Sequence, residues 1–116
     1  MSRPTDRMSA RAQEIARYKA RANAEGAVAW ADVPCASNIR MHLPKFDITA
    51  VGAEEIDEKV FGLLASAGIQ QRLVEIREFG LYVTCFLQMT DGSSNWDAVE
   101  VFLFDDDGRV AEIWAL

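Results

Sequence analysis

Glu100 is the first residue of this chain whose position favours chemistry. Residues 95–104 form an extended, β-rich segment, and alternate side chains of a strand share one face. This alternation places Glu100 on the face that also holds Ala98 and Phe102. A carboxyl group held among apolar side chains tends to stay protonated and can then donate a hydrogen bond to a developing oxyanion. The alternative is a glutamate on an edge strand that faces water.

His42 is the single histidine of the chain and is the second candidate. An imidazole titrates close to neutral pH, which suits a general base. However, residues 38–43 alternate as a strand, so His42 lies on the face opposite Met41 and Leu43. A surface or dimer-interface histidine is therefore the alternative to a catalytic one.

Apolar and aromatic side chains supply the lining that a flat hydrophobic ligand requires. The alternative is that they form only the core, although a tryptophan beside a polar turn, as at position 96, is harder to explain in that way. The predicted lining consists of Trp30, Met41, Leu43, Phe61, Leu64, Phe86, Trp96, Phe102 and Trp114.

The acidic run at residues 105–107 does not have the spacing of a calcium loop. Such loops place oxygen ligands at alternate positions and end with a glutamate, whereas these three aspartates are adjacent. Gly108 follows them between two β-rich segments and can adopt the positive φ that closes a hairpin. We predict a hairpin turn at 105–108 and no metal site.

Charge and composition exclude several functional classes. The formal net charge of −6 argues against nucleic acid as a partner, because phosphate binding requires clustered Lys and Arg. The sequence lacks zinc-ligand spacings and any apolar run long enough to span a bilayer. Cys35 and Cys85 lie far apart and no signal-like segment begins the chain, which favours a reducing cytoplasm without a disulfide. We expect no cofactor and no membrane contact.

Periodicity assigns the elements that must position these residues. Residues 1–7 are expected to be a frayed lead-in, and 8–116 a single domain, since 116 residues that are 50% hydrophobic suit one core. Apolar positions three and four residues apart predict helices at 8–25 and 53–67, with a short helix between 26 and 37. Strands are predicted at 38–43, 71–79, 81–90, 95–104 and 109–115.

This order of elements predicts an α+β fold in which helices cover one face of a curved antiparallel sheet. Strands joined by short turns pair as an antiparallel meander, and a strongly twisted sheet can curl around its helices. The curled sheet leaves a blind apolar pocket at its open end, where small ligands usually bind.

Four stretches together resemble the SnoaL-like and ketosteroid isomerase branch of the nuclear transport factor 2-like superfamily. They are ARYKARANAEG, IRMHLP, AVGAEEIDEKVFGLLASA and VEVFLFDDDGRVAEIW, of which the last is the most specific. The resemblance covers nearly the whole chain. It implies a cone-shaped α+β barrel with a deep pocket, often dimeric through the outer face of its sheet.

The same resemblance implies roles for individual residues. Glu100 stands where the isomerases keep a protonated acid, and Tyr18 lies on a helix similar to the one that carries their donor tyrosine. A core tyrosine with its hydroxyl at the surface is the alternative for Tyr18. The expected general base, an aspartate before a proline, is replaced here by Leu43, and Asp47 could substitute only by folding back over the pocket.

The function expected from these observations is a cytoplasmic pocket protein that binds a small hydrophobic, oxygen-bearing molecule. Acid/base chemistry of the isomerase, cyclase or hydrolase kind would use Tyr18, Glu100 and His42. Two alternatives stay open: a binding protein without catalysis, and a dimeric assembly or adaptor domain. Val99, Val101 and Leu103, which oppose the Glu100 face, predict a homodimer through the outer sheet.

Overall fold

The structure, a computed structural model, describes residues 8–116 and places the predicted helices and strands in an α+β fold. The expected lead-in at 1–7 lies outside the described residues. The elements are α1 (Ala10–Glu25), α2 (Ala27–Ala31), β1 (Cys35–Leu43), η2 (Pro44–Phe46), β2 (Ile48–Val51), α3 (Gly52–Ile56), η3 (Asp57–Phe61), α4 (Gly62–Ala67), β3 (Gln70–Phe79), β4 (Tyr82–Thr90), β5 (Asn95–Phe104) and β6 (Val110–Ala115).

The six strands form one mixed sheet in the order β2-β1-β6-β5-β4-β3. Strands joined by short turns are antiparallel, as predicted, but β1 and β6 pair in parallel. The prediction of a wholly antiparallel sheet is wrong at this pair, because β1 and β6 are not joined by a turn and their direction is free of that constraint. The sequence also did not indicate β2.

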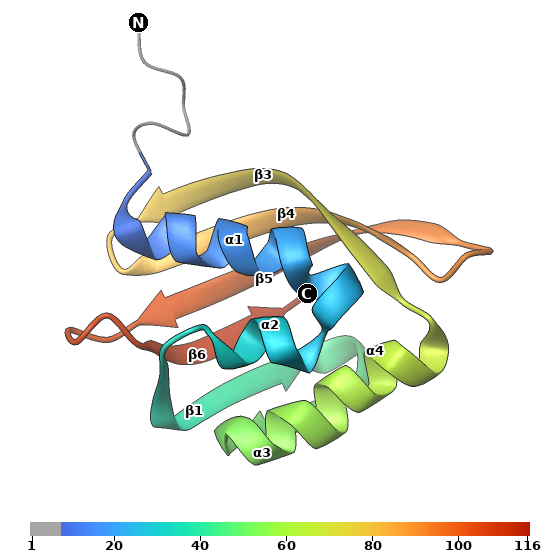
Figure 1. Ribbon diagram of the computed structural model, residues 1–116, viewed down its shortest axis with the longest axis horizontal. Helices are drawn as coiled ribbons and strands as arrows, with labels where there is room; N and C mark the ends of the chain where they lie inside the picture. Colours follow the sequence, from blue (N-terminus) through green and yellow to red (C-terminus); the bar gives the residue numbers. More distant parts are fainter. Residues whose placement is uncertain (1–7) are drawn as a thin grey trace, which may run out of the picture.

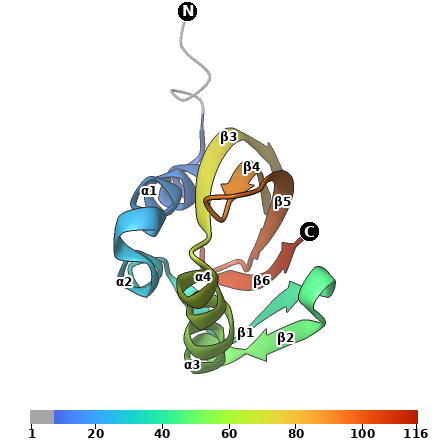
Figure 2. The same cartoon turned by 90° about the vertical axis from the view of Figure 1, so that its right-hand side faces the viewer.

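The sheet is strongly curved and the helices lie on its concave side. Figure 1 shows α1 lying over β3 and β4, while α3 and α4 lie beside β1. Seen from the end, the strands from β3 to β1 follow an arc that α1, α2 and α4 close on the open side (Figure 2). This arrangement is the curled sheet with an enclosed centre that the order of elements predicts.

Helix α1 begins at a capping serine and ends at a glycine. The side chain of Ser9 accepts a hydrogen bond from the amide of Ala12, and Gly26 adopts a φ of 53° beyond the last turn. Its buried stripe is spaced at three and four residues and consists of Ala12, Ile15, Tyr18, Lys19 and Ala22. Lys19 therefore lies on the face of α1 that packs against the core.

The second helical region contains a π-helical turn, η3, between α3 and α4. An i→i+5 turn holds more residues than an α-turn and shifts the face that follows it. As a result the consecutive residues Val60 and Phe61 are both buried, with 2% and 9% of their surface exposed. The region ends at Gly68 in the left-handed conformation, as the sequence predicts.

The final hairpin confirms the predicted turn. Gly108 has a φ of 77°, and the amide of Asp105 donates to the carbonyl of Arg109 at 2.8 Å. The side chain of Asp105 accepts hydrogen bonds from the amides of Asp107 and Arg109. The carboxylate is thus used inside the turn, where it fixes the geometry that joins β5 to β6.

Candidate functional site

An apolar cavity lies inside the curve of the sheet. It has an outer compartment of about 70 Å³ and an inner one of about 20 Å³, and five lining residues are common to both: Met41, Val60, Leu64, Gln71 and Glu100. The outer compartment reaches Phe46 and Leu116, each about half exposed, which mark its opening to solvent. The enclosed space is smaller than the 150 Å³ that admits benzene in an engineered core.

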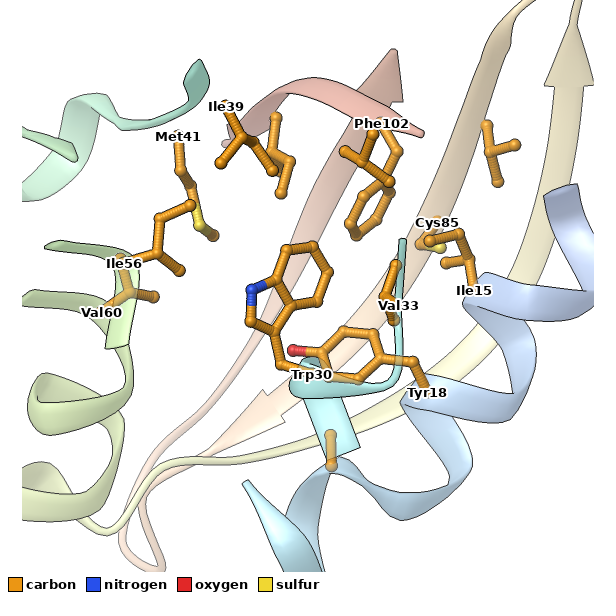
Figure 3. Packing of buried hydrophobic residues seen from close by; sticks show 14 of the residues in the cluster. Ile15, Tyr18, Trp30, Val33, Ile39, Met41, Ile56, Val60, Cys85 and Phe102 are labelled. Atoms are coloured by element: carbon orange, nitrogen blue, oxygen red, sulfur yellow. The ribbon is translucent and has the colours of Figure 1, made fainter. Parts of the chain in front are cut away.

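Aromatic rings form the wall of the inner compartment. Tyr18 and Trp30 pack edge to face with centroids 5.1 Å apart, and Trp30 lies 6.4 Å from both Phe61 and Phe102. Figure 3 shows the Tyr18 ring against Trp30, across the core from Ile56 and Val60. These contacts hold the phenol of Tyr18 in one orientation at the cavity wall.

Three polar side chains meet beside this wall. Lys19 Nζ donates to Gln71 Oε1 at 2.6 Å and forms an ion pair with Glu100 Oε1. The Lys19 side chain is 1% exposed and that of Glu100 is 13% exposed. Gln71 and Glu100 line both compartments, whereas Lys19 lies behind them, with Nζ 4.9 Å from the centroid of the Tyr18 ring.

The contact between Lys19 and Glu100 affects the pKa of Lys19 itself and that of the neighbouring Tyr18. Burial alone lowers the pKa of Lys19, but attraction to Glu100 and to Tyr18 outweighs it and the pKa lies above its ordinary value. Lys19 is therefore an ammonium ion at neutral pH. Burial raises the pKa of Tyr18 to about 12; Lys19 opposes this rise and Glu100 adds to it. Tyr18 remains a neutral phenol that can donate a hydrogen bond.

Asn23 fixes the place of Gln71. The Asn23 side chain donates to the carbonyl of Gln71 and accepts from its amide, both at 2.8 Å. These two bonds tie the last turns of α1 to the first residues of β3. The side chain of Gln71 is thereby held against Lys19, which comes from the same helix as Asn23.

Comparisons with known proteins show what this architecture is. No protein-family model matches the chain, and no curated protein matches it. Among solved structures, an NTF2-like protein of unknown function from Burkholderia pseudomallei superimposes with a TM-score of 0.78 at 16% identity, over 94% of this chain and 91% of the other. This chain has the nuclear transport factor 2-like fold. Two further structures share it.

TerC, co-crystallised with polyporic acid, matches with a TM-score of 0.77 at 15% identity, over 93% of this chain and 91% of its own. A protein of the SnoaL-like family from Agrobacterium tumefaciens matches with a TM-score of 0.71 at 14% identity, over 92% and 97%. At these identities the structural similarity establishes the nuclear transport factor 2-like fold. Any chemistry has to be inferred from the residues of this chain, because one fold can host different functions.

The nuclear transport factor 2-like fold brings most of the predicted lining together. The cavity walls include seven of the nine residues predicted as ligand-binding: Trp30, Met41, Leu43, Phe61, Leu64, Trp96 and Phe102. Phe86 and Trp114 are corrections, since neither lines these compartments. Each follows an inward-facing buried residue, Cys85 and Ile113, so alternation turns it to the outer face of the sheet.

His42 also lies on the outer face, as strand alternation indicated. Its Nε2 is 2.6 Å from Oε2 of Glu112, and its ring stacks on Trp114 with centroids 5.8 Å apart. Asp47 is exposed at the end of η2, with a φ of 53°, and is not among the residues that line the cavity. Neither residue is placed to act as a general base for a ligand inside the sheet.

The surroundings of Glu100 differ from the expectation. The residue faces inward, but Lys19 from α1 provides a cation where the sequence argument placed only apolar neighbours. The sequence held a signal for this pair, because Lys19 falls on the buried stripe of α1 between Ile15 and Ala22. Gln71 gave no comparable signal, since its contact with Lys19 depends on how β3 is placed against α1.

Proposed function

We propose that this domain binds a small, largely hydrophobic, oxygen-bearing molecule in the cavity, through Gln71 and Glu100. The observation that carries the proposal is a buried charged cluster at the wall of an apolar cavity. A buried ion pair adds little to stability compared with apolar residues of the same volume. Its presence beside an open space therefore supports a role in orienting a ligand, which few convergent polar groups in an apolar pocket commonly do.

The cavity limits the size of what it encloses. A volume of about 70 Å³ suits the oxygen-bearing end of a ligand and only a few further atoms. Larger apolar parts would extend through the opening beside Phe46 and Leu116. The structure of TerC with polyporic acid supports the proposal that this fold can hold an organic ligand.

The same cluster has the groups for proton transfer. Glu100 can accept a proton from a carbon next to a carbonyl, while Tyr18 can donate a hydrogen bond to the resulting enolate oxygen. We propose this as the acid/base chemistry of the site. If it occurs, the protein accelerates deuterium exchange at the α-carbons of butanone and Glu100→Gln abolishes the acceleration; exchange at the buffer rate in both proteins would show that the site only binds.

Binding itself is tested by filling the cavity. Ala98 lines the outer compartment, so Ala98→Leu should occupy the space and weaken binding of butanone at least about tenfold, measured by NMR titration of backbone amides. The matched control is Ala20→Leu on the exposed side of α1. Equal affinity in the wild type and both variants, or amide shifts away from the cavity, would reject the proposal.

We also propose a homodimer that uses the outer face of the sheet. Val99, Val101 and Leu103 are half-buried on the face of β5 opposite Phe102, and Phe86 and Trp114 extend the apolar surface on the neighbouring strands. Light scattering at micromolar concentration should give twice the chain mass, and Val101→Lys should give the monomer mass. A monomeric wild type would count against this assembly.

The proposed compartment is the cytoplasm. No helix in residues 8–116 is both long and apolar enough to cross a membrane. Cys35 and Cys85 are free thiols, and burial raises the pKa of each to about 12, which keeps them protonated and unreactive. Cell fractionation that placed the protein outside the cytoplasmic fraction would overturn this assignment.

A further inference from the structure

Lys19 determines which atom of Gln71 faces the cavity. An ammonium group has hydrogen-bond donors only, so the side-chain oxygen of Gln71 must point to Lys19 Nζ, as its 2.6 Å contact shows. The amide nitrogen is then directed away from Lys19. Because Gln71 lines both compartments, this nitrogen can serve as a hydrogen-bond donor to a ligand in the cavity.

Lys19 has a matching effect on Glu100. The ion pair uses Oε1, and among the hydrogen bonds of the described residues none is made by Oε2. Glu100 also lines both compartments, so its second oxygen can accept a hydrogen bond from a ligand in the cavity. Donor and acceptor stand on the same wall because both side chains converge on one nitrogen atom.

We infer that the cavity selects small neutral molecules that carry a hydrogen-bond acceptor next to a donor, such as an α-hydroxy ketone or a primary amide. The acceptor receives a hydrogen bond from Gln71 Nε2, and the donor gives one to Glu100 Oε2. This inference rests on the proposed function and specifies the ligand class for the same site.

The same donor and acceptor also determine which ligands should bind weakly. A simple ketone leaves Glu100 Oε2 without a partner, and an unpaired buried acceptor weakens binding. A carboxylate brings a negative charge to the oxygen of Glu100, while the compensating charge of Lys19 lies on the far side of the carboxylate. A free carboxylic acid anion should therefore bind least of all.

Four probes of five non-hydrogen atoms each test this selection: hydroxyacetone, propionamide, butanone and propionate. We expect hydroxyacetone and propionamide to bind the wild-type protein about tenfold more tightly than butanone, since each can donate a hydrogen bond to the charged carboxylate of Glu100 and butanone cannot. Propionate should bind more weakly than butanone. NMR titrations give all four dissociation constants, and equal affinities for hydroxyacetone and butanone, or tightest binding of propionate, would overturn the inference.

Substitution Glu100→Gln should reverse the preference. The new amide oxygen would face Lys19 for the same reason as that of Gln71, so its nitrogen would face the cavity and the wall would hold two donors. Lys19 would also lose its compensating charge. Propionate should then become the tightest of the four probes; a retained preference for hydroxyacetone in a folded variant would overturn the inference, and the wild-type series decides alone if the variant does not fold.

The two proposals fail in different ways. If none of the four probes shifts cavity amides, or if Ala98→Leu leaves every affinity unchanged, the proposed binding function fails. If butanone binds in a manner sensitive to Ala98→Leu but hydroxyacetone and propionamide gain nothing, only the ligand class is wrong. Ala20→Leu serves as the folded control in both series.

Discussion

A buried lysine–glutamate ion pair and a partly exposed histidine–glutamate contact lie on opposite faces of the same sheet, and their environments differ sharply. Lys19 and Glu100 meet on the concave side with 1% and 13% of their side chains exposed, beside the cavity. His42 and Glu112 meet on the convex side with 25% and 31% exposed. A basic side chain thus meets a glutamate twice, once in a mostly buried place and once in a partly exposed one.

The difference shows what each pair can contribute. Water and salt screen the outer pair, so its net effect on stability is small. Lys19 of the inner pair is almost fully buried and Glu100 is mostly buried, so loss of either partner leaves a largely buried charge without compensation. We therefore attribute to the inner pair a large penalty when it is broken and a role in the cavity, and to the outer pair a minor structural role or one in assembly.

The largest expected effect is that of Lys19→Met. The substitution leaves Glu100 buried without its cation, which should lower the free energy of unfolding by about 3–5 kcal/mol. Urea unfolding followed by tryptophan fluorescence measures the change. Arg17→Met, on the exposed side of the same helix turn, is the control and should change little. A loss below about 1 kcal/mol in Lys19→Met would remove the contrast between the two pairs.

The next effect is a loss of stability at alkaline pH. Tyr18 has a pKa of about 12 in the folded protein against 10.0 for the free side chain. Between these values the unfolded chain releases the proton and the folded chain keeps it, so rising pH favours unfolding. The shift corresponds to about 2–3 kcal/mol, fully present below pH 10 and lost near pH 12.

Tyr18→Phe isolates this contribution. The variant should lose stability less steeply than the wild type between pH 10 and 12, because the remaining alkaline loss comes from other groups such as Lys19. Chemical unfolding at several pH values gives the two curves. Parallel curves would mean that the Tyr18 hydroxyl is not held in the buried wall that the aromatic contacts describe.

The smallest effect is expected on the outer face. A double-mutant cycle of His42→Ala and Glu112→Gln should give a coupling energy below about 1 kcal/mol, since the pair is partly solvated. Stability measured at neutral pH and low salt is sufficient. Coupling as large as the effect of Lys19→Met would show that exposure does not separate the two pairs, for example because a second chain covers the outer face.

Much of the fold could be predicted because it depends on local patterns. The buried stripe of α1 and the turn at Gly108 follow from spacing and from backbone conformation, both of which a sequence displays. The parallel pairing of β1 with β6 could not be predicted in this way, because no turn joins them. Phe86 and Trp114 were assigned to the cavity by residue type, although alternation turns both outward.

The site was harder to predict for a related reason. Strand alternation indicated that Glu100 points inward, but its partner comes from a helix 81 residues earlier, and Gln71 joins them from a third element. Such convergence depends on tertiary placement, which periodicity does not describe. A lysine within a buried helical stripe was the available signal, since a lysine is almost never fully buried without a partner.

We propose that the inner pair serves the cavity and not the stability of the fold. Replacing both partners, Lys19→Met with Glu100→Leu, removes the charges together and should leave stability close to that of the wild type. The most direct test is the NMR titration of this double variant with hydroxyacetone. We expect a dissociation constant at least about tenfold higher than for the wild type; unchanged affinity in a folded double variant would mean that the pair does not serve the cavity.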